Sequence, residues 1–231
     1  MNQFNPELIE KNIQYTFQNK DLLRQAMSHS SYVNEIKIKG YENYERLEFL
    51  GDAVLELISS EFLFEQYKNM PEGKLTKLRA SIVCEYTLSD VAKKLQYGDF
   101  VLLSKGEALT GGRNRNSILC DLFESVLGAI YLDGGMSPAK TYVHKFLLTD
   151  IENKQLFYDA KTTLQEMVQK GTTGVVSYEL LEEKGPDHNK CFITGVSVDG
   201  IMLAKGEGSS KKNAEQMAAY QAILTLKQQN K

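Results

Sequence analysis

The chain has 231 residues, of which 42% are hydrophobic and 25% are charged, the composition of an ordinary globular protein with one large core or two modest ones. Its formal net charge of −3 does not by itself suggest a nucleic-acid partner, and it excludes binding of nucleic acid through overall positive charge. Any surface for nucleic acid must therefore be a local basic patch.

The three cysteines of the chain, Cys84, Cys120 and Cys191, lie far apart and form no CxxC pair. This spacing argues against a disulfide and against a zinc site, so we interpret each thiol as small core filler. The first residues lack the basic and apolar regions of a secretion signal, and no stretch approaches the ~20 apolar residues of a membrane span. We expect a reduced, cytoplasmic protein without membrane contact.

Apolar positions recur at helical spacing over residues 7–27, with a turn and a helix cap predicted at residues 19–21. The segment Ser28-His29-Ser30-Ser31-Tyr32 follows. A lone histidine among small hydroxyl residues is more typical of a hydrogen-bonded structural residue than of a general base. We therefore expect no catalytic role for His29.

Three carboxylates, those of Glu45, Glu48 and Asp52, stand at positions i, i+3 and i+7 and share one stripe of a predicted helix. A solvated face would explain them, but apolar residues occupy nearly every other direction around this helix, which is typical of a buried helix. Glu48 and Asp52 also form a like-charge pair four residues apart, with no lysine or arginine at i±4 to relieve either charge. A bound cation would relieve both.

A turn at residues 70–73 leads to helices predicted over residues 74–84 and 86–95. Arg79, in the first of them, can hold a neighbouring carboxylate or reach a phosphate.

Residues 103–116 form a polar, glycine-rich loop, which is either a mobile connection or a phosphate contact, and we favour contact of Arg113 and Arg115 with a phosphodiester. Few β-type alternations occur before residue 150, so the first domain should be nearly all helical.

Asp121 and Glu124 form a second acidic pair, in a segment whose apolar residues again follow a helical period. Gly128, at i+7 from Asp121, lies on the same face and leaves room for close approach of another helix. If the two acidic stripes face each other, several carboxylate oxygens converge without a basic partner. Such a hard-ligand cage suits Mg²⁺ or Mn²⁺ rather than zinc.

The pattern changes after residue 150. Residues 151–158 lose strong periodicity and are interpreted as a linker between domains at residues 1–150 and 159–228. The second domain is predicted as helix, three strands and helix, at residues 162–170, 177–184, 190–198, 201–208 and 210–228. The Asp199-Gly200 dipeptide between two alternating runs predicts a tight hairpin.

Several of these stretches resemble the ribonuclease III family. The run ERLEFLGDAVLEL at residues 45–57 resembles its signature, and GGR at 111–113, DLFE at 121–124 and LGAIYLD at 127–133 resemble its second conserved block. GPDH at 185–188 and SSKKNAE at 209–215 resemble a double-stranded-RNA-binding domain. The resemblance implies a multidomain α and α+β fold, in which an all-helical endonuclease domain precedes an αβββα double-stranded-RNA-binding domain. Asn116 stands where many family members have an acidic residue.

The resemblance also implies an activity, a magnesium-dependent endoribonuclease that hydrolyses double-stranded RNA to 5′-phosphate and 3′-hydroxyl ends, with roles in rRNA and mRNA precursor processing. We assign Glu48, Asp121 and Glu124 as ligands of Mg²⁺, for which Mn²⁺ can substitute. Asp52 and Glu124 are the residues whose loss should stop the chemistry. Glu45 is a nearby support.

The RNA-binding residues are expected in the second domain. Lys211 and Lys212 fall in the first turn of its last helix, where the helix dipole also favours phosphate. Gln165 and His188 can reach 2′-hydroxyl groups in the shallow minor groove of an A-form duplex. Glu215 stands where some such domains carry another lysine.

Two questions stay open in the sequence. The chain can be a protein that binds double-stranded RNA without cutting it, or a small-molecule phosphohydrolase with an appended domain, although the latter leaves the Lys211-Lys212 helix unexplained. The family resemblance implies a homodimer in which Phe49 packs into the partner subunit, because cutting both strands of a duplex needs two sites related by a twofold axis. The alternative is that Phe49 belongs to the core of its own subunit.

Overall fold

The computed structural model describes residues 4–171, 174–185 and 190–229. The chain divides into two compact units, Met1–Ile151 and Glu152–Lys231. Within the described residues, no helix has both the length and the apolar character that crossing a membrane requires.

Three short helices begin the first unit: α1 (Pro6–Ile13), α2 (Lys20–Ala26) and α3 (Ser30–Ile36). The side chain of Asn19 accepts a hydrogen bond from the backbone N–H of Asp21, which confirms the cap predicted there. The Nδ1 atom of His29 accepts from the backbone N–H of Ser31 at 3.1 Å and caps α3. His29 is therefore hydrogen-bonded within its own segment, as expected.

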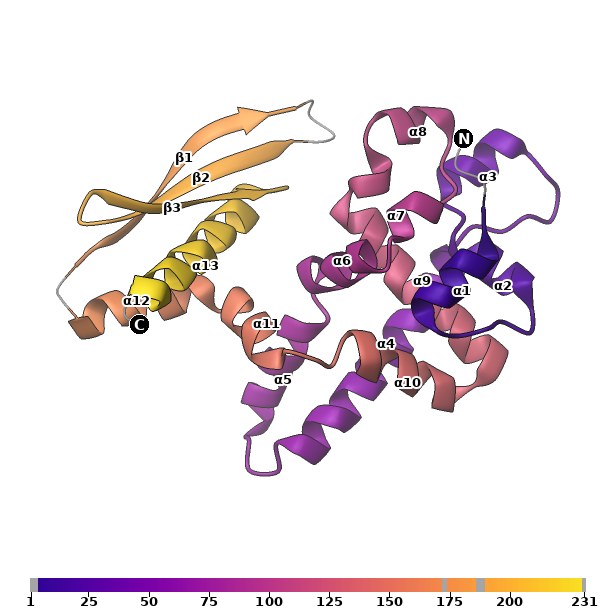
Figure 1. Cartoon of the computed structure of the whole chain (residues 1–231), viewed down its shortest axis with the longest axis horizontal. Coiled ribbons are helices and arrows are strands. Elements are labelled where there is room, and N and C mark those ends of the chain that lie inside the picture. The colour runs from indigo at the N-terminus through magenta and orange to yellow at the C-terminus, as the bar shows by residue number, and fades with distance from the viewer. Residues whose placement is uncertain (1–3, 172–173, 186–189, 230–231) are drawn as a thin grey trace. The chain divides into compact units, whose positions relative to one another are not determined.

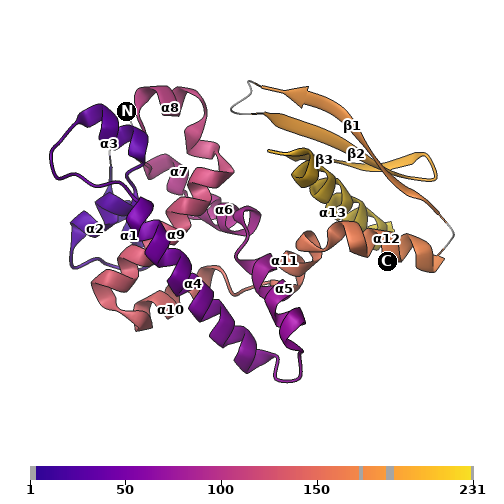
Figure 2. The ribbon, with the colours of Figure 1, turned by 180° about the vertical axis from the view of Figure 1, so that it is seen from behind.

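Two long helices, α4 (Glu45–Gln66) and α9 (Asn116–Gly134), form the centre of this unit (Figures 1 and 2). Their backbones touch, since a Cβ atom added at Gly51 would lie 1.8 Å from the carbonyl oxygen of Glu124, and one at Gly128 would lie 2.2 Å from that of Leu47. Only glycine permits this approach at either position. The close approach that Gly128 predicted is confirmed.

The remaining helices of the first unit surround this pair. They are α5 (Glu72–Ile82), α6 (Glu85–Lys94), α7 (Tyr97–Phe100), α8 (Lys105–Leu109), the 3₁₀ turn η1 (Gly112–Asn114) and α10 (Met136–Phe146). The core is apolar and fully buried along α9, with Leu122, Phe123, Val126 and Leu127 all at 0% exposure. The predicted helical character of this domain is confirmed.

Helix α11 (Ile151–Tyr158) occupies the residues expected to form the linker, and all of it after Ile151 belongs to the second unit. The ring of Phe157 packs edge-on against that of Tyr220 with centroids 5.5 Å apart. The apolar periodicity of this segment is weak because only a few side chains of the helix pack against other residues.

The rest of the second unit is α12 (Ala160–Gly171), strands β1 (Val176–Lys184), β2 (Cys191–Val198) and β3 (Ile201–Gly208), and α13 (Lys211–Gln229). The strands form an antiparallel sheet in the order β1-β2-β3, and both helices lie on one face of it (Figure 1). Asp199 and Gly200 have φ of 50° and 80°, so the predicted tight turn is confirmed. A Cβ atom at Gly206 would lie 2.1 Å from the backbone nitrogen of Ala218, so α13 packs directly on β3. The αβββα prediction is confirmed.

Candidate functional site

The contact between Gly51 and Glu124 determines where the acidic side chains lie. Glu48 precedes Gly51 by three residues and Asp52 follows it, so both flank the crossing on α4. On α9, Glu124 lies at the crossing and Asp121 almost one turn before it. The structure therefore brings together the four acids at which the sequence predicted metal binding and chemistry.

The four acids act on one another electrostatically. Burial and the charges of Asp121, Glu45 and Asp52 raise the pKa of Glu48 to about 7. Burial and the neighbouring carboxylates of Asp52, Asp121 and Glu48 raise the pKa of Glu124 to about 8. Glu48 and Glu124 thus resist ionisation until a positive charge compensates the cluster.

Tyr44 orients one of these acids. Its hydroxyl donates a hydrogen bond to Oδ2 of Asp121 at 2.9 Å, across 77 residues of sequence. The ring of His29 lies edge-on to that of Tyr44, with centroids 5.7 Å apart. Burial raises the pKa of Asp121, while the hydrogen bond from Tyr44 opposes that shift. Tyr44 could not be identified from the sequence, because no local pattern shows which residue will lie opposite Asp121.

The donor set fits a divalent cation. Among the described residues, none of the ion pairs involves Glu48, Asp52, Asp121 or Glu124, so no basic side chain neutralises the cluster. Carboxylate oxygens are the ligands that Mg²⁺ and Mn²⁺ prefer. One oxygen each of Asp121 and Glu124 and the sulfur of Cys120 all lie within 4.8 Å of one another. The sequence predicts core filler at Cys120, and its spacing of four residues also places it on the same helix face as Glu124.

Arg79 holds a carboxylate, which is one of the two roles predicted for it. Its Nε atom lies 2.7 Å from a carboxylate oxygen of Glu56, and another of its nitrogens donates to the hydroxyl of Ser60 at 2.7 Å. Glu72, which begins α5, is exposed and accepts a hydrogen bond from the hydroxyl of Thr76 at 3.0 Å.

Arg113 and Arg115, for which the sequence predicts a phosphate contact, both have partners within the chain, and the contact stays a prediction. Arg113 donates to the backbone carbonyls of Gly98 at 3.0 Å and Val101 at 2.9 Å, and Arg115 forms an ion pair with Glu107. Residues 103–116 contain α8 and η1, and the two guanidinium groups hold these turns against neighbouring backbone and carboxylate. The amide oxygen of Asn116 accepts from the ammonium group of Lys93 at 2.7 Å.

Candidate RNA-binding residues lie on the two helices of the second unit. Gln165 is exposed on α12, and Lys211 and Lys212 are exposed in the first turn of α13. His188 lies outside the described residues. Glu215, also on α13, forms an ion pair with Lys161, so its charge is compensated within the unit.

The outer side of α4 carries exposed apolar residues. Phe49 is 81% exposed, Leu57 57% and Phe64 75%. The reading of Phe49 as core of its own subunit is therefore wrong. These three side chains, spaced along one helix, are called the α4 apolar stripe below.

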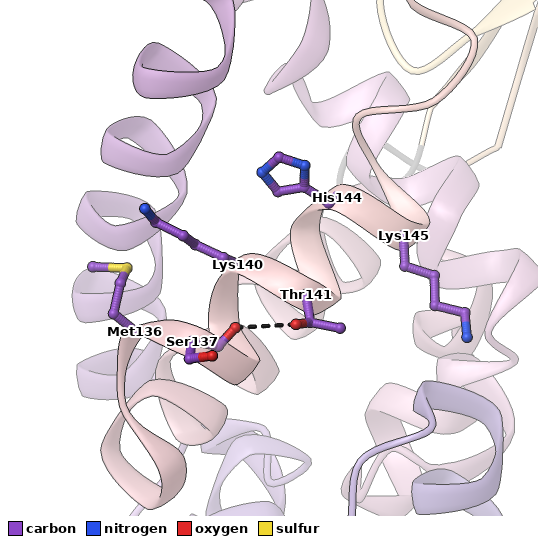
Figure 3. A pocket seen from close by; sticks show the side chains of 6 residues that line it. All are labelled: Met136, Ser137, Lys140, Thr141, His144 and Lys145. Carbon is purple, nitrogen blue, oxygen red and sulfur yellow. Dashed lines mark hydrogen bonds between the residues drawn. The ribbon is translucent and has the colours of Figure 1, made fainter. Parts of the chain in front are cut away.

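Two surface hollows lie away from the acids. One lies along α10 and is lined by Met136, Ser137, Lys140, Thr141, His144 and Lys145 (Figure 3). Its polar groups have ordinary partners, because Thr141 donates to the carbonyl oxygen of Ser137 at 3.1 Å and Lys140 pairs with Glu61 at 2.5 Å. The other hollow lies between α4, α5 and α10, beside Leu57 and Phe64. Neither hollow includes a residue of the acidic cluster.

Comparison with known proteins gives the same division of the chain. A family model described as Ribonuclease-III-like matches residues 19–151, and one described as Double-stranded RNA binding motif matches residues 160–226. The chain is 49% identical to Ribonuclease 3 of Geobacillus thermodenitrificans over 225 residues, covering 96% of this chain and 92% of the relative. It is 51% identical to Ribonuclease 3 of Anoxybacillus flavithermus over 214 residues, covering 92% and 90%.

Solved structures agree with these matches. The nuclease domain of ribonuclease III from Campylobacter jejuni superposes with a TM-score of 0.57 at 43% identity, covering 62% of this chain and 95% of that one. That structure is described as showing flexibility in the region involved in dimer formation. Both family models match, relatives align over nearly the whole length of the chain, and the acids lie at the α4–α9 crossing. The chain therefore belongs to the ribonuclease III family of double-strand-specific endoribonucleases.

Proposed function

We propose that this chain cuts double-stranded RNA at the crossing of α4 and α9 with Mg²⁺ or Mn²⁺ as its cofactor, leaving 5′-phosphate and 3′-hydroxyl ends. The observation that carries the proposal is the convergence of four carboxylates from two helices, with no described ion pair to any of them. Glu48, Asp121 and Glu124 are the proposed ligands. Precursors of rRNA and mRNA are the proposed cellular substrates.

Each acid has a proposed task. When bound, Mg²⁺ polarises the scissile phosphodiester and stabilises the departing 3′-oxygen. Glu48 and Glu124 hold protons more readily than ordinary glutamates, and they release them when a cation compensates their charge. Tyr44 fixes the carboxylate of Asp121 through its 2.9 Å hydrogen bond. Asp52 is exposed beside Glu124 and accepts a hydrogen bond from the attacking water, which orients that water for in-line attack.

The second unit is proposed to bind the RNA duplex. Lys211 and Lys212 project from the positive end of α13 and contact phosphates. Gln165 on α12 and His188, which lies outside the described residues, are proposed to reach 2′-hydroxyl groups in the minor groove. This mode of binding recognises A-form shape with little dependence on base sequence.

The proposed active assembly is a homodimer formed through the α4 apolar stripe. Exposed apolar surface of this kind marks interaction sites, and the stripe lies on the same helix as Glu48 and Asp52. A twofold axis through this surface presents two acidic clusters of opposite orientation to the two antiparallel strands of a duplex.

The decisive experiment is incubation of the purified chain with a long RNA duplex, with Mg²⁺ and with a chelator in its place. We expect Mg²⁺-dependent fragments whose ends carry a 5′-phosphate and a 3′-hydroxyl. Tight binding without cleavage in Mg²⁺ would indicate a regulatory binding protein instead. Hydrolysis of small phosphate esters with an intact duplex would indicate a phosphohydrolase.

A further inference from the structure

A thiol adjoins the proposed metal ligands. Cys120 lies on α9 one residue before Asp121 and four before Glu124, and residues four apart on a helix are neighbours on one face. Its sulfur and one oxygen from each carboxylate all lie within 4.8 Å of one another. All three side chains are partly accessible to solvent.

This donor set differs in chemistry from the four carboxylates. Oxygen ligands suit hard cations, whereas a thiolate selects soft or borderline ions such as Zn²⁺ and Cd²⁺. Around a tetrahedral Zn²⁺, with bonds of about 2.0–2.3 Å, neighbouring ligand atoms lie about 3.3–3.8 Å apart. The three donors therefore need to move by only about 1 Å to enclose such an ion.

The other two thiols have different surroundings. The sulfur of Cys84 lies 3.3 Å from the hydroxyl of Thr87, and the thiol of Cys191 donates to a carboxylate oxygen of Glu207 at 3.0 Å. In the part of the chain that the structure describes, no second group of three such donors comes together. A mixed sulfur–oxygen site is thus particular to Cys120.

We propose that Cys120, Asp121 and Glu124 form a site for a thiophilic divalent cation, such as Zn²⁺, and that this ion holds the nuclease inactive. The inference rests on the proposed function, which makes Asp121 and Glu124 ligands of the activating ion. The thiol proton passes to solvent as the sulfur–metal bond forms, and no oxidant takes part. The thiolate would neutralise part of the ion's charge and occupy one coordination position, so the bound ion would polarise a phosphodiester more weakly than Mg²⁺ held by oxygen ligands alone.

The test uses Cd²⁺ as the probe and ultraviolet thiolate-to-metal charge-transfer absorption as the readout. The chain with Cys84→Ser and Cys191→Ser keeps Cys120 as its single thiol, since the sequence has three cysteines. We expect it to bind one Cd²⁺ with this absorption. Adding Glu124→Gln should weaken binding at least about tenfold, the cost of even an outer-shell change at a metal site. Adding Cys120→Ser instead should abolish the absorption.

A second measurement uses the unmodified chain. Zn²⁺ should protect Cys120 from alkylation, as read by peptide mass spectrometry, while Cys191 reacts at an unchanged rate. Zn²⁺ added to an enzyme that is active in Mg²⁺ should stop cleavage over the same concentration range. Restoring cleavage after inhibition by Zn²⁺ should take a Mg²⁺ concentration at least about tenfold higher for the original chain than for Cys120→Ser.

Three outcomes would overturn the proposal: no absorption from the single-thiol chain, Cd²⁺ affinity unchanged by Glu124→Gln, or alkylation of Cys120 unaffected by Zn²⁺. These readouts do not depend on cleavage. Failure of the proposed function would instead appear as an intact duplex in Mg²⁺ with the cadmium site still present.

Discussion

Among single residues, Glu124 has the clearest proposed role, because its backbone forms the contact with Gly51 and its side chain lies among three other acids. We predict that Glu124→Ala abolishes cleavage while duplex binding in Ca²⁺ survives, since the proposed RNA-binding residues lie in the other unit. Cleavage and filter binding on the same preparation test this. A variant that keeps more than about a tenth of wild-type turnover has lost under ~1.4 kcal/mol, too little for a central metal ligand.

A second residue-scale prediction concerns pH. Glu48 and Glu124 have pKa values raised from 4.5 to about 7 and about 8, so the folded chain keeps protons that the unfolded chain releases. Their contribution to stability is present below pH ~4.5 and is lost as pH rises through 7 and 8. The metal-free chain should therefore lose stability between pH 5 and 8 relative to Glu124→Gln, as measured by denaturant unfolding in a chelator. Saturating Mg²⁺ should reduce this difference, and a difference of the opposite sign would refute the electrostatic account.

At the scale of elements, the α4–α9 crossing depends on two glycines. A Cβ atom at Gly51 would lie 1.8 Å from backbone, so Gly51→Ala must push the helices apart. We expect a net loss of about 1–3 kcal/mol in unfolding free energy, because overpacking outweighs the better helix propensity of alanine. Cleavage should fall with it, since the acids separate.

Gly73→Ala is the matched control for this change. Gly73 lies in α5 and a Cβ atom there would meet nothing within 4 Å. This variant should be unchanged or more stable by up to ~1 kcal/mol. Equal losses in the two variants would mean that the crossing is not the source of the effect.

The start of α13 is the element on which duplex affinity should depend. Replacing Lys211 and Lys212 together by alanine should weaken binding alike for duplexes of different sequence, and should flatten the salt dependence by up to about two units of slope. Lys227→Ala, in the last turn of the same helix, is the control and should change neither. A loss that depends on base sequence would count against recognition by shape.

At the scale of the whole molecule, the α4 apolar stripe should determine assembly. Phe49→Asp places a charge on a side chain that is 81% exposed, so the fold should tolerate it while a dimer interface should not. We expect light scattering at micromolar concentration to give a dimer for the original chain and a monomer for the variant, with loss of double-strand cutting.

Leu109→Asp serves as the control for this experiment, because Leu109 is 88% exposed on α8 and lies outside the stripe. It should remain dimeric. An original chain that is monomeric yet cuts both strands with a fixed short 3′ overhang would contradict the dimer proposal.

The sequence by itself determined the elements and their acidic faces, because helical and strand periods are local. The spacing of Glu48 and Asp52, the spacing of Asp121 and Glu124, and the Asp199–Gly200 turn all follow from intervals of a few residues. The helical first domain and the αβββα second domain could be predicted for the same reason. Residues 151–158 were harder, since a helix with few packed residues leaves a weak pattern.

Tertiary structure decided which partner each side chain takes, because packing joins residues that no local interval relates. It put Tyr44 on Asp121 across 77 residues and turned Arg113 and Arg115 inward to backbone and to Glu107. It left Phe49, Leu57 and Phe64 exposed on α4, while Val54, Leu55 and Ile58 of the same helix are buried. Helical period places a side chain on a face, but only the fold determines whether that face meets the core, a neighbouring helix or solvent.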